Sequence, residues 1–221
     1  MILLTHPRSG SEWFLTSLPK NQYGKWEPFG TLNSVPGSPE NMQGGGSISF
    51  DAKIKLLAKA AISNRAIKIH FCDIHREMQN DTWPVLLEAI NKHDLYFLVR
   101  NSIKETLISY LIAEWNDFNF HGSTHLLNKT FRIEKDKIPY YYNLIYGNTY
   151  AHKDTFQYKE QFIYEDLIDR KNTPTTLNWN PSVSPYKRRG SMRYIKLIEN
   201  YEEVLIWIDE LIQGNHVQSH P

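Results

Sequence analysis

The sequence predicts an α/β protein in which helices flank a mostly parallel central sheet. Short apolar runs at residues 2–5, 66–71 and 95–99 have the length and composition of buried strands. Segments with helical spacing of apolar residues lie between these runs and after the last one. Strands that alternate with helices in this way form parallel sheets, because each connecting helix packs back onto a face of the sheet.

The first half of the chain is punctuated by proline and glycine. Pro7 and Gly10 follow the first strand as turn residues, and the helical pattern that begins at residue 11 ends before Pro19. Residues 33–49 are rich in glycine, serine and proline and are expected to form a loop. Residues 52–62 then resume a helical pattern.

The second half continues the alternation. Residues 83–93 and 102–115 are predicted helices, and Pro84 suits the first turn of the former. Residues 161–167 predict one more buried strand, and residues 192–212 a closing helix. The tyrosine-rich residues 138–150 leave their structure open. Residues 172–186 carry three prolines and are expected to be a loop.

Length and composition suit one domain over residues 1–221 that is stable without disulfides or metal. Hydrophobic residues make up 41% and charged residues 22%, which is within the globular range. The 25 Lys and Arg residues nearly balance the 24 Asp and Glu residues, so no nucleic-acid partner is expected and any anion site must be local.

The chain is expected to be soluble and cytoplasmic. No stretch approaches the roughly 20 apolar residues that a membrane span needs. A strand follows Met1 at once, which argues against a signal peptide. The single cysteine, Cys72, cannot form an internal disulfide or a zinc site of several cysteines, and it fits a reducing compartment.

The turn after the first strand has the composition of a phosphate site. A strand that turns into a helix presents backbone N–H groups and the positive helix end to an anion. Ser9 and Ser11 add hydroxyl groups, Gly10 permits close approach and Arg8 supplies positive charge. An ordinary turn with helix-capping serines explains the same residues. The usual triphosphatase loop is excluded, because G-x-x-x-x-G-K-[ST] is missing.

Residues 5–13, "THPRSGSEW", resemble the 5′-phosphosulfate loop T-Y-P-K-S-G-T-x-W of the sulfotransferases, with Arg8 for lysine and His6 for tyrosine. These enzymes use 3′-phosphoadenosine 5′-phosphosulfate (PAPS) and release PAP. The resemblance implies a P-loop nucleotide-hydrolase-like sulfotransferase architecture without metal, and a catalytic role for Arg8. The cofactor-binding residues it implies here are Arg8, Ser9, Gly10, Ser11, Glu12 and Trp13.

Three further stretches are similar to sulfotransferase motifs in the same order. "VRNSIKETLISY", residues 99–110, implies that Arg100 and Ser109 bind the 3′-phosphate, although they lie one residue further apart than in the family. "FIYEDL", residues 162–167, is similar to a recurrent strand end. "KRRG", residues 187–190, resembles the R-K-G loop over the 3′-phosphate, without its tryptophan-containing remainder. The residues implied there are Arg188, Arg189 and Gly190.

"AIKIHF", residues 66–71, resembles the K-T-H motif and implies that His70 is the general base. An imidazole with a pKa near 6.5 is largely neutral at pH 7 and can accept a proton. His75 and a carboxylate are rival bases, and a purely structural histidine is a further interpretation.

The expected reaction is in-line transfer of a sulfuryl group from PAPS to a hydroxyl of a small-molecule or glycan acceptor. Positioning and charge stabilisation would supply most of the catalysis, as in phosphoryl transfer. Two alternatives stay open. One is a non-catalytic nucleotide-binding relative of the fold, and the other is a P-loop small-molecule kinase. The sequence leaves the oligomeric state and the acceptor undefined.

Overall fold

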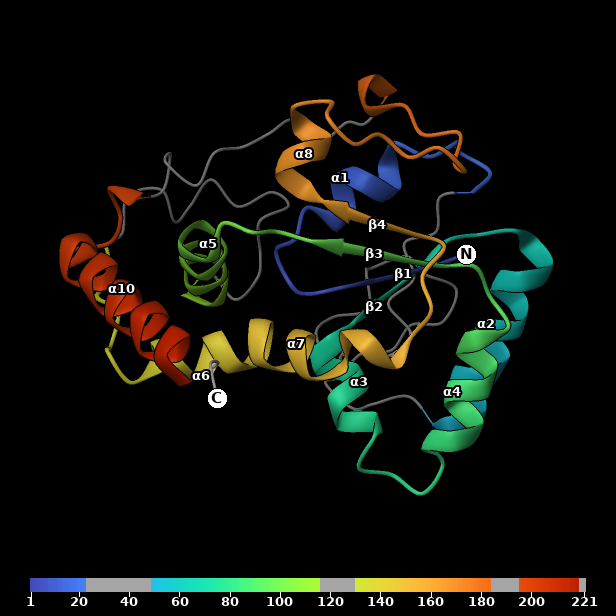
Figure 1. Cartoon of the computed structure of the whole chain (residues 1–221), viewed down its shortest axis with the longest axis horizontal. Coiled ribbons are helices and arrows are strands. Elements are labelled where there is room, and N and C mark those ends of the chain that lie inside the picture. Colours follow the sequence, from blue (N-terminus) through green and yellow to red (C-terminus); the bar gives the residue numbers. More distant parts are fainter. Residues whose placement is uncertain (23–48, 116–129, 184–194, 219–221) are drawn as a thin grey trace. The chain divides into compact units, whose positions relative to one another are not determined.

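The structure is a computed structural model of the chain, and it describes residues 1–22, 49–115, 130–183 and 195–218 (Figure 1). The chain forms two compact units. Unit 1 comprises residues 1–101 and 145–187, and unit 2 comprises residues 102–144 and 188–221. The prediction of one domain over residues 1–221 stays a prediction.

Unit 1 is built on a sheet of four parallel strands in the order β2-β1-β3-β4. The strands are β1 (Ile2–Thr5), β2 (Ile67–His70), β3 (Leu95–Val99) and β4 (Glu160–Ile163). The predicted α/β class with a parallel sheet is confirmed for the described residues. From β1 the chain passes to β2 on one side and then to β3 on the other. The strand order therefore reverses between β1 and β3, where open parallel sheets form their ligand crevices.

Helices cover both faces of this sheet (Figure 1). Alternate residues of β1 point to opposite faces, as the period of two requires. The helices of unit 1 are α1 (Ser11–Thr16), α2 (Phe50–Ser63), α3 (Phe71–Glu77), α4 (Trp83–Asn91), α7 (Asn148–His152) and α8 (Tyr164–Ile168). Leu3 packs in the cluster with α1 and α8, whereas Ile2 and Leu4 pack in the cluster with α2, α3 and α4.

Local chemistry sets the ends of these helices. The Ser49 hydroxyl accepts a hydrogen bond from the Ala52 N–H at 3.3 Å and so caps α2, which ends where Asn64 adopts a left-handed conformation with φ 52°. Thr16 and Ser17 donate back to carbonyls of α1, at 2.7 Å in each case. Such side-chain bonds compete with the helical backbone, and α1 stops there, before the predicted end at Pro19.

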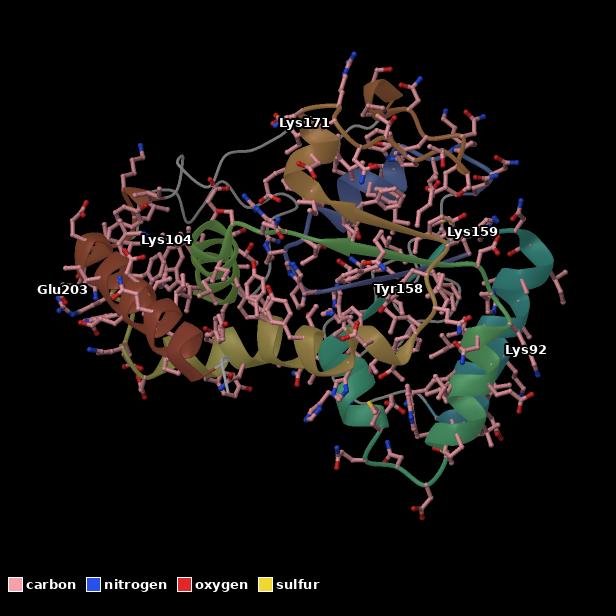
Figure 2. All side chains as sticks on the ribbon, in the orientation of Figure 1. Lys92, Lys104, Tyr158, Lys159, Lys171 and Glu203 are labelled. Atoms are coloured by element: carbon pink, nitrogen blue, oxygen red, sulfur yellow. The ribbon has the colours of Figure 1, made fainter. Side chains whose placement is uncertain are left out.

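Unit 2 contains α5 (Ile103–Trp115), α6 (Lys137–Tyr142) and α10 (Tyr201–Gln218). Residues 143–147 form a turn of π-helix that continues the chain from α6 into α7. The Trp115 and Phe131 rings stack with centroids 4.3 Å apart. Lys104 of α5, labelled in Figure 2, is 2.6 Å from a carboxylate oxygen of Asp209 on α10. The tyrosine-rich residues 138–150 therefore lie in α6, in the π-helical turn and in α7, so this segment is largely helical.

Three boundaries differ from the sequence prediction. The strand predicted over residues 161–167 ends at Ile163, because β4 pairs only along Tyr96–Val99 and β3 offers no partner beyond Val99. The strand predicted through residue 71 ends at His70, and α3 begins at once because Phe71 and Ile74 lie one helical turn apart and both enter the core. The closing helix predicted from residue 192 is α10, which starts at Tyr201, and residues 192–194 lie outside the described residues.

Within the described part of the chain, no helix combines the length and the hydrophobicity needed to cross a membrane. The cytoplasmic location stays a prediction.

Asn200 is a single buried side chain that fixes the backbone of unit 2. Its Oδ1 accepts from the Ile133 N–H at 3.0 Å, and its Nδ2 donates to the Ile133 carbonyl at 2.9 Å. We expect Asn200→Ala to lower the free energy of unfolding by about 2 kcal/mol, because both backbone groups lose their partner. Urea unfolding measures the effect, and Asn91→Ala on an exposed site is the control. Equal stability of both variants would contradict this role.

Candidate functional site

The turn from β1 to α1 is anchored to β3 through two hydroxyl groups. The Thr5 Oγ1 lies 2.7 Å from the Leu98 carbonyl oxygen and 2.5 Å from the Ser9 Oγ. A carbonyl can only accept, so the single Thr5 proton goes to Leu98 and the Ser9 hydroxyl donates to Thr5. Ser9 is fully buried, and its hydroxyl therefore serves the shape of the turn.

Two residues of this turn have left-handed backbone conformations, Arg8 with φ 63° and Gly10 with φ 86°. Such a conformation is uncommon for a residue with a side chain and is found preferentially at functional sites. Arg8 is exposed. At Gly10 a Cβ atom would lie 2.2 Å from a carbon of the Tyr164 ring, so only glycine fits beneath that ring.

His6 joins the turn to the end of β3 across the switch point. Its Nδ1 lies 2.8 Å from the Pro7 carbonyl oxygen, and its Nε2 accepts from the Arg100 N–H at 2.9 Å. These partners fix the neutral tautomer with the proton on Nδ1. The pKa of His6 is lowered to about 4, chiefly by burial and also by the nearby Arg100 charge, against the raising effect of the Pro7 carbonyl.

Arg100, one of the predicted nucleotide-binding residues, is held by its backbone and its side chain. Tyr146 donates from its hydroxyl to the Arg100 carbonyl at 2.9 Å, and its ring packs 5.0 Å from the His6 ring. The guanidinium carbon lies 5.2 Å from the centroid of the Tyr164 ring, and Nε is 3.7 Å from Glu165 Oε1. The same α8 tyrosine that covers Gly10 therefore also contacts Arg100.

Three of the other predicted residues lie at the start of α1. Glu12 accepts from Lys68 of β2 at 2.9 Å. Trp13 packs edge to face against Tyr164 and Trp179, with centroids 5.7 and 5.2 Å apart. Ser11, the first residue of α1, is buried. The side chains of Glu12 and Trp13 thus fasten α1 to the sheet and to the loop that follows α8.

His70, the predicted base, is the last residue of β2, directly beside Thr5 of β1 in the sheet register. It therefore lies at the same edge of the sheet as the turn. β2 is an edge strand among the described residues. The His70 side chain is 17% exposed, and its Nδ1 is 3.9 Å from Asp73 Oδ2 on α3.

A group of metal-ligating types surrounds His70. Ligand atoms of His70, Cys72 and Asp73 all lie within 4.8 Å of one another. Arg76 is 3.2 Å from the Asp73 carboxylate and already balances its charge. Burial and the Asp73 charge raise the pKa of the Cys72 thiol, which favours the thiol over the thiolate that zinc prefers.

His75, the rival base, lies on α3 with its ring stacked on that of His152 of α7. The His75 Nδ1 and His152 Nε2 are 2.9 Å apart. Burial and the proximity of His75 lower the pKa of His152. His75 is therefore occupied in a contact between α3 and α7.

The remaining predicted residues fall elsewhere. Ser109 is a partly buried residue of α5 in unit 2. Arg188, Arg189 and Gly190 lie outside the described residues, as does most of the loop predicted over residues 33–49.

The contacts that assemble the turn are not predicted from the sequence. The motif places His6 only as a substitute for tyrosine, and Tyr146 lies in the segment 138–150, for which the sequence predicts no definite structure. Both bind backbone atoms of Arg100, and a backbone partner leaves no residue pattern in the sequence. The contact between Tyr164 and Gly10 is likewise not predicted, although both residues lie in stretches that resemble sulfotransferase motifs.

No family model matches the chain, and no curated protein and no solved structure matches it. Fold and site together define an α/β protein with a basic, glycine-containing turn at the switch point of a parallel sheet.

Gly10→Ala should destabilise the protein by roughly 2 to 4 kcal/mol. The substitution combines a left-handed conformation with a clash against the Tyr164 ring. Gly214→Ala is the matched control, because this α10 position has open space around it and helix propensity favours alanine. Chemical denaturation measures both, and a Gly10→Ala protein as stable as Gly214→Ala would contradict the packing.

His6 should make the stability depend on pH between about 6.5 and 4. The unfolded chain binds a proton near pH 6.5, but the folded protein binds it only near 4, so stability is full above 6.5 and falls as the pH drops. The loss amounts to about 3 kcal/mol at most.

His6→Phe tests this assignment, because phenylalanine has no acceptor for the Arg100 N–H. We expect a loss of roughly 1 to 3 kcal/mol at pH 7 and a flatter stability curve from pH 6.5 to 4. Urea denaturation across this range gives both quantities. An equally steep curve in the variant would assign the pH dependence to other groups.

Proposed function

We propose that the protein is a sulfotransferase that moves a sulfuryl group from PAPS to a hydroxyl acceptor, with the P-loop-like sulfotransferase architecture that its motifs resemble. One observation carries the proposal. Parts of three stretches that resemble sulfotransferase motifs meet at the carboxyl edge of the sheet, namely residues 5–13, 99–101 and 164–165. The contact between His6 and Arg100, for example, joins residues that are 94 positions apart.

The turn would hold the 5′-phosphosulfate end of the nucleotide. Arg8 is exposed, and its charge with the backbone N–H groups of residues 9–13 suits the bridging oxygen, on which negative charge grows as the S–O bond breaks. Because the Ser9 hydroxyl is buried against Thr5, its contribution would come through the backbone. The side chains of Glu12 and Trp13 would support the turn.

Arg100 would bind the 3′-phosphate. The Tyr164 ring and the Glu165 carboxylate beside its guanidinium set the direction of the side chain at the sheet edge. A planar guanidinium suits a phosphate because it donates two parallel hydrogen bonds. Glu165 would have to yield part of that contact to the phosphate.

His70 would accept the proton of the acceptor hydroxyl. It lies on the strand next to β1, at the edge where the turn begins, and its side chain is partly exposed. A neutral imidazole that lies near the reacting hydroxyl serves as a general base near pH 7.

A second candidate is a non-catalytic nucleotide-binding protein of the same fold. The observation in its favour is that Ser9 and Arg100 already have protein partners, as expected of a turn kept for shape. The remaining alternative is a P-loop small-molecule kinase, which would use ATP in place of PAPS.

Arg8→Ala and Arg100→Ala should each weaken PAP binding at least tenfold, since each removes a charge-assisted contact of about 1.4 kcal/mol or more. Calorimetric titration with PAP, ADP and ATP measures the affinities. The control is Arg65→Ala, because this exposed arginine precedes β2 at the opposite edge of the sheet. Unchanged PAP affinity in both variants would contradict the assignment, and equal ATP and PAP affinity would favour the kinase.

A further inference from the structure

We propose that Asp73 is a positioning residue for His70 that holds the ring with Nδ1 toward its carboxylate and stabilises the imidazolium form. This inference rests on the proposed function, in which His70 is the general base. Asp73 follows His70 by three residues, at the point where β2 passes into α3. Its side chain is 8% exposed, and its Oδ2 lies 3.9 Å from His70 Nδ1.

The two oxygens of the Asp73 carboxylate face different partners. Oδ2 faces His70, whereas Oδ1 accepts from Arg76 Nη2 at 3.2 Å. The guanidinium balances the charge of the buried carboxylate and fixes its plane. At 3.9 Å the two atoms lie beyond hydrogen-bond length, and catalytic contacts of this kind often tighten only when substrate is bound.

A buried ion pair fixes α3, which carries this carboxylate. Lys53 of α2 donates to Glu77 Oε1 at 2.6 Å, and both side chains are almost fully buried. Arg76 Nε lies 3.8 Å from the same oxygen. Positive and negative groups therefore alternate from Lys53 to Asp73, and a proton on His70 would extend the alternation by one more positive group.

The charged groups of this network come from α2 and α3. Those on α3 are Asp73, Arg76 and Glu77, and Lys53 reaches this network from α2. α4 and α7 also pack on α3, and His152 of α7 contacts His75. The Asp73 carboxylate faces the Nδ1 atom of the His70 ring.

The dyad gives each nitrogen of His70 a separate task. With the Nδ1 proton directed at Asp73, Nε2 carries the lone pair that accepts the proton of the acceptor hydroxyl. The acceptor O–H bond breaks as its oxygen bonds to sulfur, and the S–O bond to the nucleotide breaks with its electron pair going to the PAP phosphate. The proton stays on His70 until it passes to solvent.

The experiment measures the pKa and the tautomer of His70 by NMR in the full chain, with His70→Gln identifying its signals. Asp73→Asn should lower the pKa of His70 by about one unit, and Asp73→Glu should restore part of it. Asp81→Asn, the same change at an exposed position after α3, should leave it unchanged. An unchanged pKa in a folded Asp73→Asn protein would overturn the proposal.

The tautomer of the wild-type protein provides a test that needs no variant, so the proposal stays testable even where Asp73→Asn fails to fold. A proton on Nδ1 supports the dyad, and a neutral ring with its proton on Nε2 overturns it. These readouts do not require turnover. If PAP does not bind but the His70 pKa and tautomer are as expected, the sulfotransferase function is overturned and the Asp73–His70 contact is supported. If PAP binds but the His70 pKa is unchanged by Asp73→Asn, only the dyad is overturned.

Discussion

The candidate site depends on one buried, neutral imidazole. His6 bridges the turn after β1 and the first residue after β3, with a carbonyl on one side of its ring and an N–H on the other. Only the neutral ring offers one donor and one acceptor, and complete burial keeps it neutral by penalising charge. The two strand ends on either side of the switch point are thereby kept at a fixed spacing, and the exposed Arg8 stands directly beside that bridge.

The second constraint comes from α8, a short helix that contacts Gly10 and Trp13 on one side and Arg100 on the other. Tyr164 covers Gly10, packs on Trp13 and lies under the Arg100 guanidinium. Glu165 faces the same guanidinium. A helix placed directly after β4 can do this because parallel strands end at one edge of the sheet. Residues far apart in the chain thus acquire common neighbours.

The sequence predicted the strands well, because apolar runs such as Leu95–Val99 are buried on both faces of a parallel sheet and leave an unbroken hydrophobic signal. It also selected Arg8, Arg100 and His70, all of which lie at the carboxyl edge. It could not predict the end of β4, since this boundary depends on where β3 stops. Nor could it predict the start of α3, which depends on Phe71 and Ile74 entering the core. The partners of His6 stayed hidden because they are backbone atoms that every residue possesses.

The fit of Gly10 beneath Tyr164 has a consequence for the order of folding. β1 precedes β4 in the chain, yet the ring that covers its turn comes from α8, which follows β4. Contacts of such long sequence separation form slowly, because the intervening chain must be ordered first. The turn after β1 is therefore among the last parts of unit 1 to take its final shape.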